Sequence, residues 1–232
     1  MATLPYEELN NIESRKIRKR DSGNRSSETK RRSIPYNEFF GEMYLTEDEK
    51  ETRIQMANAL DDVFVFMFAT LALITDVGEI TYPVIYEMAE RRYKDAIEPF
   101  LTARALESMS IDNIIANQVR LIVDTTMKHI DDPYYTSDDR AMYVAENQAN
   151  VIQNAVNEEE AIEAGYTHKT WVTMRDPLVR QSHRDADGQT VPIMHPFSVG
   201  DSLLGYPCDS GYGADAQEIA GCRCTVEYSK QV

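Results

Sequence analysis

Residues that bind transition metals gather near the C-terminal end of the chain. Cys222 and Cys224 are one residue apart, so an extended backbone would place both thiols on the same side. With His183 they offer three nitrogen and sulfur ligands of the kind that hold structural zinc, and Cys208 or His195 would supply the fourth. A spacing of one residue is less typical of zinc sites than two to four, so a second interpretation stays open. In it, the thiols pack as small hydrophobic groups and the histidine binds a carbonyl. In either case we expect the histidine and the Cys-Arg-Cys thiols to lie within a few ångströms of one another.

A thiol- or metal-dependent hydrolase is a further interpretation of the same residues. Cys222 or Cys224 would be the nucleophile, His183 its base, and Asp185 or Asp187 the group that orients the base. The spacing does not favour this arrangement, because a catalytic triad is defined by its three-dimensional geometry. The sequence contains no EF-hand, P-loop or His-Glu-x-x-His motif. We therefore expect no catalytic residue, and no cofactor apart from a structural zinc ion.

A small α+β unit, expected over residues 167–232, must position these side chains. Alternation of side-chain types around Trp171 is typical of a strand, and Gly188 permits a tight reversal of the backbone. The loops between 197 and 221 are rich in Gly, Pro and Asp and have too few aliphatic residues to be held by packing alone. Short strands are expected over 168–174, 189–193 and 225–228, with one or two helical turns over 179–184.

A mainly helical domain, expected over residues 34–166, precedes this unit. Hydrophobic residues recur there at spacings of three and four, which predicts amphipathic helices. Ser110 is expected to cap the third long helix, and Gly165 to end the fourth. The fold class is therefore α+β, with four antiparallel helices expected over 46–75, 82–100, 110–127 and 137–165.

Three smaller features bear on the site. Arg180 and Arg223 are expected to bridge carboxylates or carbonyls in loops that lack regular hydrogen-bond ladders. The acidic run 158–160 is expected to form a solvated helix face. The aromatic residues of the last segment favour a packed core over a base-stacking platform. They are Trp171, Phe197, Tyr206 and Tyr228.

The first 33 residues differ from the rest in charge. They hold nine Lys or Arg and five Asp or Glu. The whole chain has 24 basic and 39 acidic residues, so the rest of the chain, called the body here, has 15 basic and 34 acidic residues. This segment has few aliphatic side chains, and their burial cannot offset the conformational entropy lost when the chain becomes ordered. A flexible basic arm is therefore expected over 1–33. Clustered Arg and Lys can neutralise phosphates, whereas docking on an acidic protein surface is the alternative. The residues proposed to contact DNA are Arg15, Lys16, Arg18, Lys19, Arg20, Arg31 and Arg32.

Composition excludes several classes of protein. The formal net charge of -15 disfavours a general nucleic-acid binder. Three cysteines are too few and odd in number for a secreted disulfide framework, so synthesis in a reducing cytosol is expected. The longest apolar run, 63–74, is shorter than the roughly 20 residues that a bilayer requires, so it is expected as a buried core helix and no membrane association is predicted.

The ordered series of motifs from residue 170 to the end resembles the C-terminal domain of the phage Mu F-like minor head proteins, the phage head morphogenesis family. The resemblance covers about a quarter of the chain and is specific through the combination of motifs. Cys208 stands where the family usually has Gly, and Gly221 where it usually has Asn. The residues that carry the resemblance are Trp171, Asp176, Arg180, His183, Gly188, Phe197, Pro207, Cys222, Arg223 and Cys224.

The resemblance implies a virion component. Members of the family act in head morphogenesis, enter the procapsid in few copies, and associate with the portal protein and the packaged genome. A location in the capsid interior near the portal vertex is therefore expected, with capsid or scaffold proteins as further partners. Two other functions compete with this one: the hydrolase described above, acting in the host, and a DNA-binding accessory protein that uses the basic arm.

Overall fold

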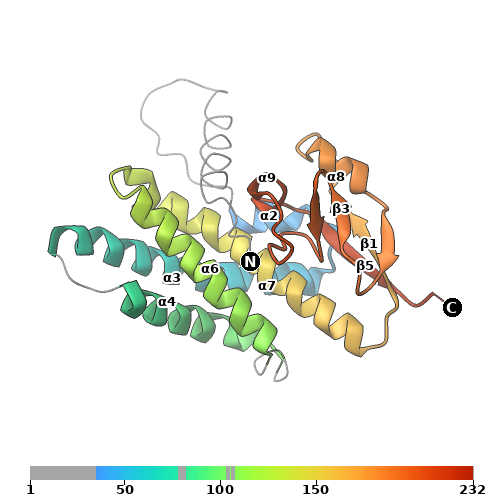
Figure 1. Ribbon diagram of the computed structural model, residues 1–232, viewed down its shortest axis with the longest axis horizontal. Coiled ribbons are helices and arrows are strands. Elements are labelled where there is room, and N and C mark those ends of the chain that lie inside the picture. Colours follow the sequence, from blue (N-terminus) through green and yellow to red (C-terminus); the bar gives the residue numbers. More distant parts are fainter. Residues whose placement is uncertain (1–34, 78–81, 103–104, 106–107, 232) are drawn as a thin grey trace. The chain divides into compact units, whose positions relative to one another are not determined.

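The computed structural model describes the chain outside residues 1–34, 78–81, 103–104, 106–107 and 232. The chain divides into two compact units (Figure 1). Among the described residues, the helical unit contains 35–41 and Glu47–Val156, and the C-terminal unit contains Glu42–Thr46 and 157–231. The two units therefore divide within the last long helix, ten residues before the boundary expected at 166, and the C-terminal unit includes a short segment from far upstream.

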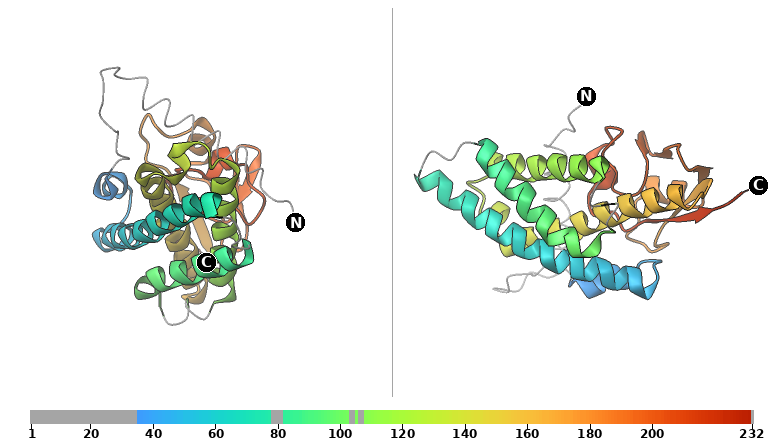
Figure 2. Two further views of the ribbon diagram at one scale, coloured as in Figure 1. Left: turned by 90° about the vertical axis from the view of Figure 1, so that its left-hand side faces the viewer. Right: turned by 90° about the horizontal axis from the view of Figure 1, so that it is seen from below.

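Four long helices make up most of the helical unit, as the spacing of hydrophobic residues predicts (Figure 2). Asp132 caps a short 3-10 turn between the last two of them and accepts a hydrogen bond from the Tyr134 backbone. Gly165 has a φ of 74°, which fits its expected place just beyond the last helix. The elements are α2 (Tyr36–Gly41), α3 (Glu47–Val77), α4 (Tyr82–Ile97), η1 (Glu98–Phe100), α6 (Met109–Lys128), η2 (Pro133–Thr136) and α7 (Asp138–Glu163).

The core of the helical unit combines aromatic packing with one buried cation. Phe64 of α3 meets Tyr93 of α4 edge to face, with the ring centroids 5.9 Å apart. Arg53 of α3 is fully buried and donates hydrogen bonds to the side-chain oxygens of Asn150 at 3.1 Å and Asn154 at 2.8 Å, both on α7. These bonds fix the facing sides of α3 and α7, because a buried guanidinium requires acceptors.

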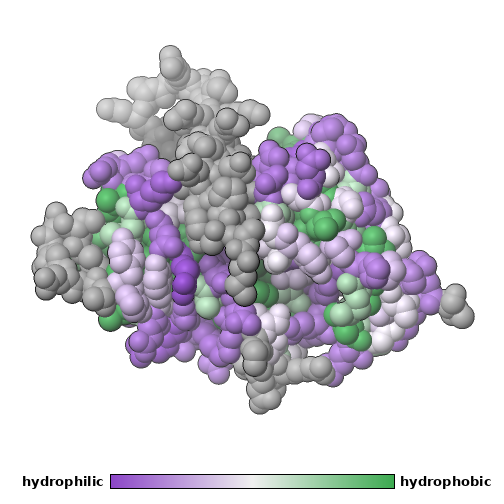
Figure 3. Space-filling view, viewed as in Figure 1, coloured by the Kyte–Doolittle hydropathy of each residue, from purple (hydrophilic) through white to green (hydrophobic). Residues whose placement is uncertain are grey.

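Helix α3 is also long and apolar enough over Glu47–Leu73 to cross a membrane, by length and composition alone. A core helix of a soluble protein passes the same test, and 44% of the apolar window of α3 is buried. Leu60, Phe64 and Phe68 are buried inside the unit, and Arg53 lies on the same helix. On the face drawn in Figure 3, hydrophobic residues appear as small patches among hydrophilic ones.

The start of α6 corrects one expectation from the sequence. Ser108, and not Ser110, is the N-cap: its side-chain oxygen accepts a hydrogen bond from the Ser110 backbone N–H at 3.2 Å. Both serines precede the same hydrophobic repeat, and sequence patterns locate helix ends less well than helix interiors.

This cap gives a matched pair of variants. Ser108→Ala should lower the free energy of unfolding by about 1 kcal/mol, because it leaves a helix N-terminal N–H without its acceptor. Ser110→Ala should change it by less than about 0.5 kcal/mol, since its side chain is exposed in the first turn. Urea unfolding followed by circular dichroism compares the two. Equal losses in both variants would show that Ser108 is not the cap.

The C-terminal unit is a small α+β arrangement, which confirms the expected fold class. A three-stranded antiparallel sheet has the order β2-β1-β5, and a separate antiparallel hairpin pairs β3 with β4. Alternation around Trp171 therefore predicted β1, the central strand, correctly. The elements are β1 (His168–Val172), α8 (Gln181–Ala186), β2 (Thr190–Pro192), β3 (Phe197–Val199), β4 (Ser202–Leu204), α9 (Ala216–Ile219) and β5 (Thr225–Ser229).

The β3–β4 hairpin and α9 were expected as loop. Each strand has three residues and α9 has four, which is too short for a clear hydrophobic period. Gly200, with a φ of 58°, lies in the turn between the strands. The hairpin buries Phe197 and Val199 on one side, which brings this segment into the core.

Candidate functional site

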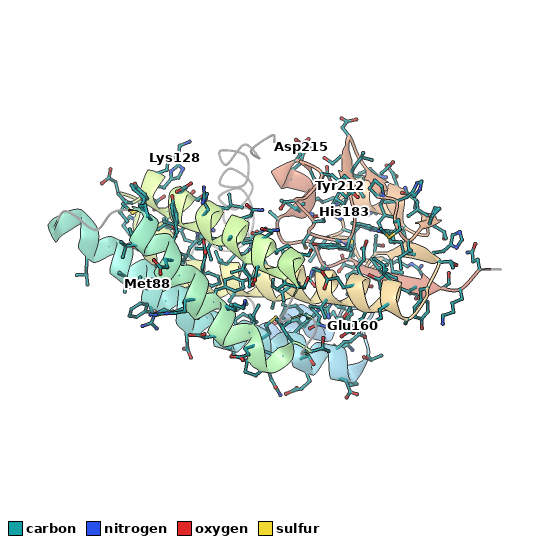
Figure 4. All side chains as sticks on the ribbon, turned by 60° about the horizontal axis from the view of Figure 1, so that its bottom comes forward. Met88, Lys128, Glu160, His183, Tyr212 and Asp215 are labelled. Carbon is teal, nitrogen blue, oxygen red and sulfur yellow. The ribbon has the colours of Figure 1, made fainter. Side chains whose placement is uncertain are left out.

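His183, Cys222 and Cys224 form one buried cluster in the C-terminal unit. His183 comes from α8, and the two cysteines immediately precede β5. The His183 Nδ1 atom lies 3.3 Å from the Cys224 sulfur and 3.5 Å from the Cys222 sulfur. All three potential ligand atoms lie within 4.8 Å of one another, and the three residues are only 2–3% exposed. Figure 4 shows His183 among the side chains enclosed by the strands and loops of this unit.

The two residues expected to compete as fourth ligand have different positions. Cys208 is buried, its sulfur lies 3.7 Å from the Cys222 carbonyl oxygen, and its thiol contacts the Cys222 sulfur. It lies outside the group whose ligand atoms are all within 4.8 Å. His195, the alternative to Cys208, is exposed in the turn after β2 and is not in that group either.

Glu218 occupies the other side of the His183 ring. Its Oε2 atom lies 3.1 Å from His183 Nε2 and accepts a hydrogen bond from the Ser182 hydroxyl at 2.6 Å. A carboxylate accepts hydrogen bonds and does not donate them, so Nε2 carries the proton of this contact. Nδ1 consequently faces the two sulfurs. Sequence reasoning missed this partner, although Glu218 belongs to a short motif that is visible in the sequence.

The charges of His183, Cys222 and Cys224 depend on one another. Burial lowers the pKa of His183, but the Cys222 sulfur and Glu218 outweigh burial and raise it to about 9. Burial raises the pKa of the Cys222 thiol, but hydrogen bonds from Cys208 and Cys224 and the charge on His183 hold it well below its ordinary value. The Cys222 sulfur and burial together raise the pKa of Cys224. Cys222 and His183 therefore each favour the charged form of the other.

Trp171 supports the cluster from the central strand. Its indole is fully buried and meets the His183 ring edge to face at 5.6 Å and the Phe197 ring at 5.3 Å. The backbone turn that follows α8 is bonded to the same residue, because the Gly188 N–H donates to the Trp171 carbonyl at 2.8 Å. Gly188 has a φ of 79°, a conformation that costs a residue with a Cβ about 1–2 kcal/mol. Strand β1 and α8 are thus held together around the histidine.

Two arginines hold the surrounding loops. Arg180 donates a hydrogen bond to the Ala220 carbonyl next to the Cys-Arg-Cys segment. Arg223 donates to Asp176 at 2.6 Å, and Asp176 in turn accepts bonds from the backbone N–H groups of residues 178 and 179. Arg223 also lies 3.6 Å from Glu42 in the upstream segment of this unit. Both arginines therefore make the kind of contact with carboxylates and carbonyls that was expected of them.

The remaining motif residues divide between the core and the surface. Pro207 is buried beside Cys208 in the loop after β4. Tyr228 does not join the Trp171 cluster as expected: it is part-exposed and lies 6.3 Å from the Tyr166 ring. Its position on an edge strand of the sheet explains this difference.

Lys169 and Glu158 form a second buried interaction that the sequence did not predict. The Lys169 ammonium lies 2.8 Å from Glu158 and donates to the Gly205 carbonyl at 2.6 Å. Its side chain is 1% exposed and that of Glu158 is 15% exposed. The expectation that the acidic run 158–160 is a solvated face was wrong at its first residue, because α7 turns that residue toward β1.

The hydrolase interpretation finds little support in this geometry. Asp185 accepts a hydrogen bond from Gln181, and Asp187 binds Thr173 and Arg175, so Glu218 stands where either was expected to orient the base. The thiols and the histidine are almost fully buried, so no substrate can approach them without local opening. The residue types and their spacing would also suit a metal ion or a structural cluster.

Asp187 gives a pH-dependent prediction. Burial raises its pKa, but hydrogen bonds from Thr173 and from Arg175 outweigh burial and hold the pKa below its ordinary value. A lowered carboxylate pKa stabilises the fold above pH 3.8, and this stabilisation is lost as the pH falls through the folded-state value. Asp187→Asn should therefore reduce stability at pH 7 and have a smaller effect at pH 3. Urea unfolding followed by the fluorescence of the single tryptophan measures the stability of both proteins at each pH. A stability difference that does not change with pH would contradict the prediction.

The basic residues proposed to contact DNA lie outside the described residues. They are Arg15, Lys16, Arg18, Lys19, Arg20, Arg31 and Arg32. Their role therefore remains a prediction from charge.

Comparison with known proteins gives one match. A family model described as "Phage Mu protein F like protein" matches residues 104–227. The match includes α6, α7 and every strand of the C-terminal unit except the last residues of β5. Searches among curated proteins and among solved structures found no significant match.

Proposed function

Because the chain belongs to the phage Mu protein F like family, which matches more than half of it, we propose that it is a minor head protein that acts in phage head morphogenesis. It is a structural and non-enzymatic component of the virion, located inside the capsid near the portal vertex. The match over residues 104–227 is the observation that carries this proposal. Burial of the thiols and histidine supports a structural role over a catalytic one.

Contacts with other head proteins require an accessible surface, and the helical unit offers one. Val65 and Leu73 of α3 and Val84 of α4 are exposed by 39%, 66% and 54%. Packing of α3 against α4 places these apolar side chains on neighbouring elements. Exposed apolar groups on adjacent helices favour protein contacts, since their burial removes apolar surface from water. These exposed side chains are the contacts that we propose for the portal protein or for capsid or scaffold proteins.

The experiment that tests this function uses phage particles. Mass spectrometry of purified procapsids and mature virions should detect the protein, and cross-linking should join it to the portal protein. A phage with the double substitution Leu73→Glu and Val84→Glu should package less of the protein. The matched control is Leu178→Glu, which alters an exposed apolar residue of the C-terminal unit. Absence of the wild-type protein from both kinds of particle would refute the proposal.

A role near the packaged genome is supported by the charge of the N-terminal arm. The arm is the net-positive segment of an otherwise acidic chain, and an acidic body repels phosphate. Arg15→Gln with Arg18→Gln should weaken DNA binding and reduce its dependence on salt. Arg91→Gln with Arg120→Gln removes the same charge from the body and should leave binding unchanged. Equal losses in the two double variants would assign DNA binding to another surface.

A further inference from the structure

We propose that Cys208, Cys222, Cys224 and His183 bind one structural zinc ion in the C-terminal unit. This inference stands apart from the proposed role in the phage head, because it depends only on side chains within one compact unit. Three sulfurs and one imidazole nitrogen form a ligand set that suits tetrahedral zinc better than calcium or magnesium, which prefer oxygen.

Distances in the cluster match those of a zinc site. Zinc bonds of about 2.0–2.1 Å to nitrogen and about 2.3 Å to sulfur, at tetrahedral angles, place nitrogen and sulfur about 3.5 Å apart. His183 Nδ1 lies 3.3 Å from the Cys224 sulfur and 3.5 Å from the Cys222 sulfur. The imidazole nitrogen therefore already lies at the distance from both sulfurs that a zinc ion would require, and all three ligand atoms lie within 4.8 Å of one another.

The second nitrogen of His183 supports the same assignment. A histidine that binds a metal nearly always donates its other ring N–H to a carboxylate, a carbonyl or water, which fixes the orientation of the ring. Glu218 Oε2 lies 3.1 Å from Nε2, and the Ser182 hydroxyl holds that oxygen in place at 2.6 Å. Nδ1 then presents its lone pair toward the sulfurs.

Cys208 is the fourth ligand. It has a φ of 72°, and the left-handed conformation costs a residue with a side chain about 1–2 kcal/mol, whereas glycine would adopt it without strain. The strained residue supplies a buried thiol that contacts the Cys222 sulfur. Its sulfur must approach His183 and Cys224 more closely when the ion binds, because it lies outside their 4.8 Å group.

Trp171 and the loop architecture fit a metal as well. The buried indole N–H of Trp171 has no well-formed acceptor among the described residues and lies beside the Cys224 sulfur, and a thiolate would accept its hydrogen bond. The chain from β4 to β5 contains only α9 as regular structure. Small units with little regular structure are commonly stabilised by a metal. On binding, three protons leave for solvent, one each from Cys208, Cys224 and the Cys222–His183 pair, and zinc remains divalent throughout.

Metal analysis of the full-length wild-type chain is the first test. The protein is purified with a non-thiol reductant, incubated with zinc sulfate, separated from unbound metal by gel filtration and analysed by mass spectrometry for metals. We expect about one zinc per chain. Less than about one tenth of a zinc per chain, in protein that shows native tryptophan fluorescence, would overturn the proposal.

Variants then identify the ligands. Glu218→Gln should lower zinc affinity by about 10- to 100-fold, because it removes the carboxylate that orients His183. Cys224→Ser should abolish stoichiometric binding. His195→Ala is the matched control, since it removes an exposed imidazole outside the cluster, and it should retain one zinc. Loss of zinc in His195→Ala equal to the loss in Cys224→Ser would overturn the assignment.

Cobalt spectroscopy tests the fourth ligand in protein that stays folded. Cobalt(II) chloride added to the metal-free wild type should give the visible bands of a tetrahedral site and intense sulfur-to-cobalt charge transfer. Cys208→Ser should reduce the charge-transfer absorbance by roughly one third, because two of three thiolates remain. Unchanged absorbance in Cys208→Ser would overturn the four-ligand site.

Discussion

Replacing Trp171 with alanine should lower the free energy of unfolding of the C-terminal unit by about 3–5 kcal/mol. The indole is fully buried between the rings of His183 and Phe197, so its removal leaves a cavity at the centre of the unit. Strand pairing cannot close that cavity, because the backbone of Trp171 remains bonded to residues 188 and 189. Hydrogen exchange over residues 167–231 measures the loss without needing the tryptophan signal.

Two control variants make this prediction specific. Trp171→Phe keeps an aromatic ring against His183 and should lose less stability than the alanine variant. Leu178→Ala changes a side chain that is 77% exposed and should stay within about 0.5 kcal/mol of wild type. If Trp171→Ala stayed within the same limit, the indole would not be the centre of this core.

Replacing Lys169 with alanine should be comparably destabilising, by about 3–5 kcal/mol, because it leaves a buried carboxylate without its partner. Burial raises the pKa of Glu158, and contacts with Lys169 oppose this rise. Loss of the ammonium should raise that pKa further and also remove the donor to the Gly205 carbonyl. A carboxylate with a raised folded-state pKa destabilises the fold at higher pH, so the loss should be larger at pH 8 than at pH 5.

A double-mutant cycle separates the pair from its surroundings. Lys169→Met with Glu158→Gln removes both charges and keeps similar volumes, so it should recover most of the stability that Lys169→Ala loses. Urea unfolding followed by tryptophan fluorescence measures all variants. Additive effects of the two single substitutions, Lys169→Met and Glu158→Gln, would show that the two charges are not coupled in the folded protein.

Much of the fold could be predicted from local patterns. The spacing of hydrophobic residues identified α3, α4, α6 and α7, because a helix of several turns repeats its buried face many times. Alternation around Trp171 identified β1. The β3–β4 hairpin could not be found in this way, since three residues do not establish a period.

The candidate site was predictable in its ligand types and not in its supporting contacts. Cys222 and Cys224 are separated by a single residue, and their chemistry points to histidine as a partner. Glu218, however, is 36 residues from Ser182, with which it shares a hydrogen bond, and many other carboxylates in this acidic chain were equally plausible partners. Nothing in the sequence around Lys169 distinguishes it from an exposed lysine on a strand. Its burial depends on Glu158 of α7 and on the Gly205 carbonyl, which are distant in sequence.

The C-terminal unit combines the upstream segment Glu42–Thr46 with residues near the other end of the sequence, so it can complete its folding only late in synthesis. Thr225 donates a hydrogen bond to the Tyr44 carbonyl across 181 residues of chain, and β5 adds to β1 only after residues 225–229 exist. Residues 225–229 must therefore be synthesised before the sheet and the Cys-Arg-Cys segment can close. Contacts within the helical unit, including those of Arg53 with α7, become available well before then. During synthesis, Trp171, His183 and the cysteines of the cluster therefore remain accessible to chaperones, oxidants and metal ions until β5 emerges.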